Sequence, residues 1–119
     1  MRFSRVQKEV LFAYGDTIYS PSGKNIPDYL ITHEEVHQRQ QTAIGGPKIW
    51  WDKYLSDDKF MLSQEIEAYH EQYKFYCAQE KELSLRYKML MACATALSGP
   101  VYGNSIGKAH ALFRIKYGK

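Results

Sequence analysis

The sequence predicts an α+β fold that is mostly α, a compact helical domain with a small N-terminal β-hairpin or edge strand. Three observations lead to this prediction. Apolar residues recur at three- and four-residue steps over several long segments, which is typical of helices with one buried face. Turn-forming residues separate these segments, and β-prone residues gather near the N-terminus. With 119 residues, 45% of them hydrophobic, the chain is long enough for one domain over residues 1–119 with one core.

The N-terminal β element is predicted from residues 10–14 and 17–19, which read Val-Leu-Phe-Ala-Tyr and Thr-Ile-Tyr. Aromatic and β-branched residues favour strands, and Gly15 with Asp16 between the two segments favours a tight turn. The pattern therefore predicts a short hairpin or two edge strands. Residues 20–25 are rich in Ser, Pro, Gly and Asn, and they predict a loop.

Two helices are expected between this loop and residue 55. The first contains the motif described below and ends before the helix breakers Gly45, Gly46 and Pro47. Residues 29–32 are either the first turn of this helix or a strand leading into it, and the sequence leaves both open. Pro47 suits the first turn of the second helix, which is short and aromatic and spans residues 48–55.

Three more helices are expected in the second half of the chain. Residues 56–58, Ser-Asp-Asp, are typical of a helix N-cap and predict a helix from about 59 to 80. A helix over residues 83–97 follows, with no Gly or Pro between it and the preceding helix, and it stops at Ser-Gly-Pro, residues 98–100. A final helix is predicted over residues 105–117.

Charge and hydropathy exclude several classes of protein. The 16 basic and 13 acidic residues give a net charge of +3 and are mixed along the chain, so we expect no nucleic-acid partner. No apolar run approaches a membrane span, and the basic N-terminus lacks the apolar segment of a secretory signal. We therefore expect a cytoplasmic protein that does not bind membranes. Cys77 and Cys93 are expected to be buried, reduced thiols within helices.

Residues 33–37 read His-Glu-Glu-Val-His and match the H-E-x-x-H pattern of zinc hydrolases. Residues four apart lie one above the other on a helix, so His33 and His37 can direct two imidazoles at one Zn²⁺ ion. Glu34 lies beside the first of these ligands, within reach of a water molecule on the metal. It is therefore the candidate catalytic residue, which takes a proton from that water and passes it on.

A catalytic zinc ion usually has three protein ligands, so a third must lie elsewhere in the chain. The other histidines, His70 and His110, and the acidic residues after the motif are candidates. Residues 38–43 read Gln-Arg-Gln-Gln-Thr-Ala, which excludes the metzincin arrangement with a third His shortly after the motif.

Helical phase distinguishes two carboxylates, Glu65 and Glu67, on the predicted helix over residues 59–80. Glu65 falls on the apolar face and Glu67 points away from it. An acid on an apolar face is costly unless it is paired or bound to a metal, which favours Glu65 as the third ligand. The alternative is that Glu65 borders this face and is solvated. The residues that mark the face are Phe60, Leu62, Ile66, Tyr69, Tyr73 and Tyr76.

The motif at residues 33–37, followed by Glu-Ile-Glu-Ala at residues 65–68, resembles the gluzincin metallopeptidases, in particular minigluzincins and small metallopeptidases of phages and other mobile elements. The resemblance covers roughly residues 29–73. It implies a zincin-like helical fold with Zn²⁺ as the cofactor. It also implies that the two histidines and Glu65, three residues before the Ala, are the metal ligands.

Two tyrosines bear on the expected activity. Many relatives carry Asp or Asn directly after the Ala, where it supports a ligand His, whereas this chain has Tyr69. Its hydroxyl is a candidate replacement, although a phenol orients an imidazole less strongly than a carboxylate does. Tyr102, in Gly-Pro-Val-Tyr-Gly, is either presented to the cleft as an oxyanion donor or packed on the core. Residues 10–19 are the candidate edge strand for an extended substrate.

These features predict zinc-dependent hydrolysis of a peptide or protein substrate. His33, His37 and Glu65 would hold the metal, and Glu34 would activate the metal-bound water. The alternative is a non-catalytic zincin-like protein-interaction module that retains a metal site. The two differ in whether replacing Glu34 abolishes hydrolysis while the metal stays bound.

Overall fold

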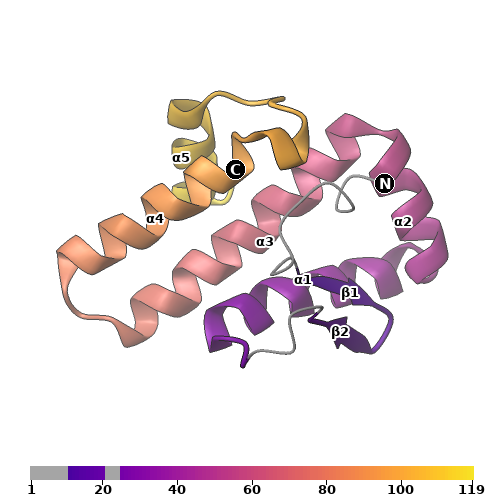
Figure 1. The fold of residues 1–119 in the computed structure, drawn as a ribbon, viewed down its shortest axis with the longest axis horizontal. Coiled ribbons are helices and arrows are strands. Elements are labelled where there is room, and N and C mark those ends of the chain that lie inside the picture. The colour runs from indigo at the N-terminus through magenta and orange to yellow at the C-terminus, as the bar shows by residue number, and fades with distance from the viewer. Residues whose placement is uncertain (1–10, 21–24) are drawn as a thin grey trace.

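The computed structural model describes residues 11–20 and 25–119, which are mostly helical with a two-stranded sheet at the start (Figure 1). The predicted fold class, α+β and mostly α, is confirmed. In chain order, the elements are β1 (Phe12–Tyr14), β2 (Thr17–Tyr19), α1 (Asp28–Ile44), α2 (Pro47–Ser56), α3 (Asp58–Gln79), α4 (Leu83–Leu97), the 3₁₀ helix η2 (Pro100–Tyr102) and α5 (Lys108–Tyr117).

The predicted hairpin forms as an antiparallel pair of strands, β1 and β2. Gly15 lies in the turn between them at φ 63°, a conformation that glycine adopts without a steric penalty. Val10 of the predicted first strand and residues 21–24 of the predicted loop lie outside the described residues. The register pairs Phe12 with Tyr19, Ala13 with Ile18, and Tyr14 with Thr17.

Gln41, on α1, fixes the hairpin to the helices. Its amide nitrogen donates to the Ala13 carbonyl oxygen at 2.8 Å, and its amide oxygen accepts from the Gly15 backbone N–H at 2.8 Å. The indole N–H of Trp51, on α2, donates to the same Ala13 oxygen at 2.9 Å. Gln41 is 1% exposed, so its hydrogen bonds are shielded from water. The hairpin is thereby held beside the helix that carries the His-Glu-Glu-Val-His motif.

Helix α1 carries the motif and packs along α3 (Figure 1). It begins at Asp28, so residues 29–32 form its first turn rather than a strand. It ends where Gly45 takes the left-handed conformation at φ 113°, which favours glycine. The motif therefore lies within a continuous helix that faces α3.

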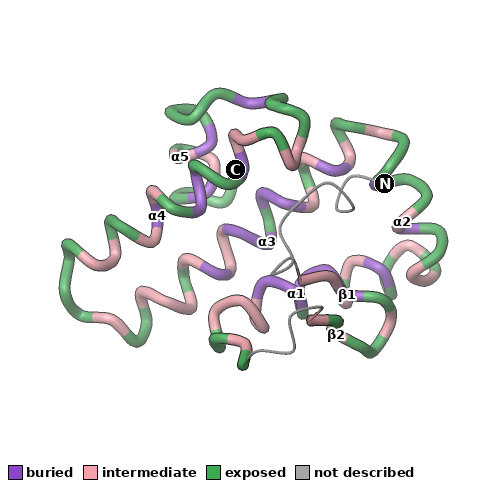
Figure 2. Tube along the Cα trace, in the orientation of Figure 1, coloured by how far each residue is buried: buried purple, intermediate pink, exposed green. Residues whose placement is uncertain are grey.

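Two clusters of buried apolar residues hold the helices together. The larger joins α3, α4 and α5, and the smaller joins α2 to the start of α3 through Trp50, Tyr54 and Met61. Tyr102, on η2, packs against both clusters. Figure 2 shows that buried positions recur along α1 and α3. The larger cluster consists of Ile66, Tyr69, Leu90, Cys93, Ala94, Leu97, Ile106, Ala111 and Ile115.

The boundaries of the later helices agree with the prediction except at the start of α5. Asp57 caps α3 as expected, because its carboxylate accepts two backbone N–H groups of the first turn at 3.0 and 3.1 Å. Helix α5 begins at residue 108 and not at residue 105. Ile106 is instead buried in the core, and Gly107 is extended at ψ 156°.

Both cysteines are free thiols within helices, Cys77 on α3 and Cys93 on α4. Cys93 is buried as predicted, whereas Cys77 is half-buried because it lies close to the end of α3. In the described part of the chain, no helix combines the length and the apolar character that crossing a membrane requires.

Candidate metal centre

The buried face of α1 is largely polar. Burying polar side chains is costly unless each is hydrogen-bonded, paired or bound to a metal. The partners of these side chains therefore indicate the role of the helix. The buried residues of α1 are His33, Glu34, Val36, His37 and Gln41.

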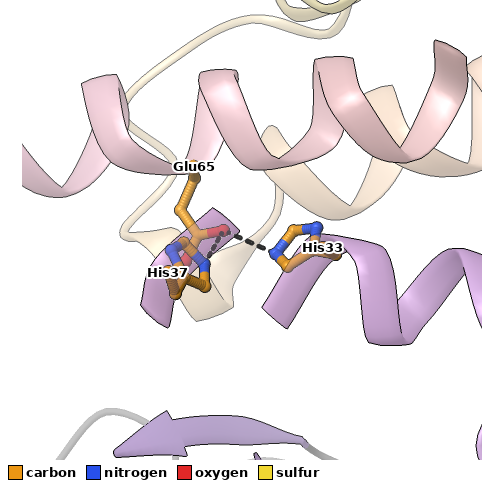
Figure 3. A group of neighbouring side chains, drawn as sticks. All are labelled: His33, His37 and Glu65. Atoms are coloured by element: carbon orange, nitrogen blue, oxygen red, sulfur yellow. Dashed lines mark hydrogen bonds and ion pairs between the residues drawn. The ribbon is translucent and has the colours of Figure 1, made fainter. Parts of the chain in front are cut away.

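Two imidazoles of α1 and one carboxylate of α3 converge on one point (Figure 3). The Nε2 atoms of His33 and His37 lie 3.0 and 3.2 Å from Oε1 of Glu65. The ligand atoms of the three residues all lie within 4.8 Å of one another. Glu65 is 3% exposed, so the alternative of a solvated Glu65 is wrong. The four-residue spacing on α1 and the packing of α1 along α3 bring the group together.

Two glutamine side chains orient the imidazoles. Nδ1 of His33 lies 2.9 Å from Oε1 of Gln72, and Nδ1 of His37 lies 2.7 Å from Oε1 of Gln40. An amide oxygen only accepts hydrogen bonds, so in both rings Nδ1 carries the proton. In their neutral form, the two imidazoles therefore present the lone pair of Nε2 to Glu65.

The amide of Gln40 is itself held in one orientation. Its nitrogen donates to the backbone carbonyl oxygen of Gln64 at 3.0 Å and to the carboxylate of Glu67 at 2.7 Å. Turning the amide over would place its oxygen against these two acceptors and its nitrogen against Nδ1 of His37. The hydrogen bonds of Gln40 thus fix the protonated nitrogen of His37 at Nδ1.

The donor atoms of this group fit a metal ion. Two imidazole lone pairs and a carboxylate oxygen within 4.8 Å of one another repel unless a proton or a metal cation lies between them. Zinc ligands lie about 2.0–2.2 Å from the metal, which sets neighbouring atoms of a tetrahedral site about 3.3–3.6 Å apart. The two N···O distances, 3.0 and 3.2 Å, are close to that spacing. His33, His37 and Glu65 therefore form a buried group that could hold a metal ion.

The ionisation of this group follows from its burial and its mutual charges. Burial alone raises the pKa of the Glu65 carboxyl, but the two imidazoles outweigh burial and lower this pKa well below its usual range. Burial lowers the pKa of His37, but the carboxylate of Glu65 outweighs burial and raises this pKa to about 9. A metal that binds at neutral pH therefore has to displace a proton from His37.

Glu34 lies beside the group and belongs to the same buried face of α1. Its Oε2 is 3.9 Å from Nε2 of His33, and the residue is 7% exposed. Burial raises the pKa of the Glu34 carboxyl, against the opposing effect of the neighbouring imidazoles. A carboxylate with a raised pKa is a stronger proton acceptor than one at the surface.

Two cavities adjoin the site. The smaller, about 60 Å³ in volume, has room for several water molecules and is lined by the three convergent residues and Glu34. The larger, about 260 Å³, shares His33 and Glu34 with the smaller. Glu34 is therefore accessible from both. The other residues that line the smaller cavity are mainly aromatic, namely Phe12, Trp50, Trp51, Tyr54 and Tyr102.

The other ligand candidates lie away from this group. Glu67 is exposed, as its helical phase predicts, and accepts a hydrogen bond from Gln40. His70 is half-buried against α5, where its Nδ1 lies 2.6 Å from the Ile115 carbonyl oxygen. His110 is exposed on α5.

Tyr69 does not take the place of the carboxylate that supports a ligand His in the gluzincins. Its ring packs edge-on against the ring of His33, with centroids 4.4 Å apart at 73°. Its hydroxyl lies 3.0 Å from the hydroxyl of Tyr102. Gln72 supports His33 instead, because it follows Glu65 by two helical turns and shares its face of α3. The candidate role of the Tyr69 hydroxyl as this replacement is therefore wrong.

Tyr102 shows features of both roles considered for it. It is half-buried and packs against both apolar clusters, and it also lines both cavities at the site. Burial raises the pKa of its hydroxyl well above the usual range, so the hydroxyl keeps its proton. A role of this hydroxyl as a hydrogen-bond donor to an oxyanion stays a prediction.

Sequence reasoning misses three side chains at this site: Gln40, Gln72 and Tyr54. The hydroxyl of Tyr54 donates to Oε2 of Glu65 at 2.5 Å. Helical spacing contains a signal for the two glutamines, which lie one turn after the second motif His and two turns after Glu65. It contains none for Tyr54, which reaches the site from a different helix, α2.

No family model matches the chain, and comparisons with curated proteins and with solved structures give no match. The functional proposal therefore rests on the residues of the site and their geometry.

Proposed function

We propose that the protein is a zinc-dependent peptidase of the gluzincin kind that hydrolyses a peptide or protein substrate. One observation supports it most: Glu34 is buried beside the group of His33, His37 and Glu65 and lines the same small cavity as these three residues. A purely structural metal site gains nothing from a further buried carboxylate 3.9 Å from a ligand imidazole. Hydrolysis needs a general base beside the metal, where it can take a proton from the attacking water molecule.

Zinc is the metal we propose because of the donor set. Two imidazole nitrogens and one carboxylate oxygen are typical protein ligands of catalytic zinc, which keeps a further position open. Magnesium and calcium prefer oxygen ligands throughout. A zinc ion held by these residues would polarise a carbonyl oxygen and lower the pKa of a bound water molecule.

Side chains of the protein transfer the protons and orient the imidazoles that would bind the metal. Glu34, whose pKa burial raises, accepts a proton from the attacking water and passes it to the leaving amine. Gln40 and Gln72 keep the Nε2 lone pairs of the imidazoles directed at the metal. The aromatic walls of the smaller cavity limit the access of bulk water to the reacting groups.

Replacing Glu34 tests the proposal. Wild type and the Glu34→Gln variant are loaded with zinc, and zinc content and hydrolysis of a fluorogenic peptide library are measured. We expect equal zinc content but a rate at least about 100-fold lower in the variant, since a general base contributes about 10²–10⁴-fold. Glu35→Gln is the matched control, because Glu35 is the adjacent, exposed glutamate of the same motif. We expect it to hydrolyse peptides at the wild-type rate.

The Glu65→Ala variant tests the metal site separately from the chemistry. Loss of the carboxylate leaves two imidazoles, so we expect the variant to lose its zinc on dialysis while wild type retains it. A wild type that retains zinc but hydrolyses no peptide in the library contradicts the peptidase. That result favours the non-catalytic interaction module.

A further inference from the structure

We infer that Tyr54 is a positioning residue for the metal ligand Glu65. Its hydroxyl donates a hydrogen bond to Oε2 of the Glu65 carboxylate, so that only Oε1 is left to bind the metal. The inference rests on the proposed zinc site and adds to it a residue from α2, a helix that contributes no ligand.

The two oxygens of the Glu65 carboxylate have different partners. Oε1 faces Nε2 of His33 at 3.0 Å and Nε2 of His37 at 3.2 Å. Oε2 accepts the hydrogen bond from the Tyr54 hydroxyl at 2.5 Å. A hydroxyl that donates to a carboxylate forms a short, charge-assisted bond, stronger than one between neutral groups. Turning Oε2 toward a metal would break this bond and leave a buried hydroxyl without its acceptor.

Tyr54 is held rigidly where it makes this contact. It is 6% exposed, and its ring stacks on Trp50 with centroids 4.7 Å apart and an interplanar angle of 28°. The indole N–H of Trp50 donates to Oε1 of Gln64 at 2.8 Å. The ring of Trp50 also lies 5.0 Å from that of His37. The hydroxyl of Tyr54 is thus fixed by packing against the same helices that carry the ligands.

A carboxylate that binds through one oxygen matters for the proposed chemistry. Catalytic zinc has three protein ligand atoms and keeps a position for water or substrate. A Glu65 bound through both oxygens would occupy a further position. By holding Oε2, Tyr54 keeps that position available.

Cobalt(II) substitution tests the inference, because four-coordinate Co²⁺ absorbs visible light more strongly than Co²⁺ with more ligands. The Tyr54→Phe variant keeps the ring but frees Oε2. We expect it to bind Co²⁺ about 10–100-fold more weakly, as for other residues that support a metal ligand, and with weaker visible absorption. Tyr69→Phe is the matched control, because it removes another buried phenol whose hydroxyl bonds to Tyr102 and not to a ligand. We expect it to keep the wild-type spectrum.

A measurement on wild type covers the case in which Tyr54→Phe fails to fold. The hydroxyl proton of Tyr54 should give a low-field proton resonance, assigned through its contacts with the Tyr54 ring, that persists when one equivalent of Zn²⁺ is added. Loss of this resonance on zinc binding overturns the inference, as does a Tyr54→Phe variant with the wild-type affinity and spectrum. Either result leaves the peptidase proposal standing, whereas a wild type that binds no metal removes both.

Discussion

The residues that orient the imidazoles of the proposed metal site are neutral. Amide oxygens of Gln72 and Gln40 accept the Nδ1 protons of His33 and His37. A carboxylate in the same place would make each imidazole a stronger electron donor. With amides there, a bound metal retains more of its positive charge, which favours polarisation of a carbonyl and acidification of water.

Removal of one such amide should weaken metal binding without removing a ligand. For Gln72→Leu, we expect zinc affinity to fall about 10–100-fold, because the His33 ring loses the acceptor that fixes its tautomer. The affinity is measured by competition with a chromophoric chelator. Gln79→Leu, at an exposed position at the end of the same helix, is the control and should bind zinc as wild type does.

Metal affinity should depend on pH through His37. Its pKa is raised to about 9, so below that pH the metal must displace the His37 proton. Affinity should therefore rise with pH, about tenfold per unit, up to about pH 9, and titration calorimetry in buffers of different ionisation enthalpy should show about one proton released per zinc at pH 7.5. An affinity that is constant between pH 6.5 and 8.5 is incompatible with this account.

Among the elements, the hairpin depends on one side chain of α1. Gln41 makes two hydrogen bonds to β1 and its turn, and it is 1% exposed. We expect Gln41→Ala to lower the free energy of unfolding by about 1–3 kcal/mol, because the Gly15 N–H loses its acceptor and the Ala13 oxygen keeps only the donor from Trp51. Urea denaturation measures this, with Gln38→Ala, one turn earlier on α1 and less buried, as the control. An equal loss in both variants would mean that the effect comes from the helix and not from the hairpin anchor.

The elements themselves follow closely from local sequence signals. Gly45 ends α1, Pro47 begins α2 and Asp57 caps α3, each at the position that the sequence predicts. Gly45 and Pro47 act through their backbone preferences, and Asp57 acts through hydrogen bonds of its side chain. The start of α5 differs because Ile106 is drawn into the core, which is a tertiary effect. Local pattern does not contain that information.

The sequence predicts the part of the site that follows from helical periodicity. Phase on one helix brings His33 and His37 together and places Glu65 on the inward face of another. The contact of Tyr54 with Glu65 depends on how α2 packs against α3, and sequence spacing does not encode it. The sequence makes Tyr69 a candidate for the hydrogen bond that Gln72 forms, because both residues lie on the helix face that contacts the His33 imidazole.

At the level of the whole molecule, a metal at this site would join three helices. Its ligands come from α1 and α3, and Tyr54 adds α2, beside both apolar clusters. A metal that binds the folded chain alone stabilises it by about 2.7 kcal/mol at a free concentration 100 times its Kd. We therefore expect zinc to raise Tm by several degrees in scanning calorimetry and EDTA to reverse the shift. Glu65→Ala should show no zinc-dependent change.

Anomalous diffraction at the zinc absorption edge, from crystals of the zinc-loaded protein, locates the metal directly. We expect one strong peak within bonding distance of Nε2 of His33, Nε2 of His37 and Oε1 of Glu65, with Oε2 of Glu65 still hydrogen-bonded to the Tyr54 hydroxyl. A peak at other residues, or no peak at this group in crystals that contain zinc, contradicts the proposed zinc site.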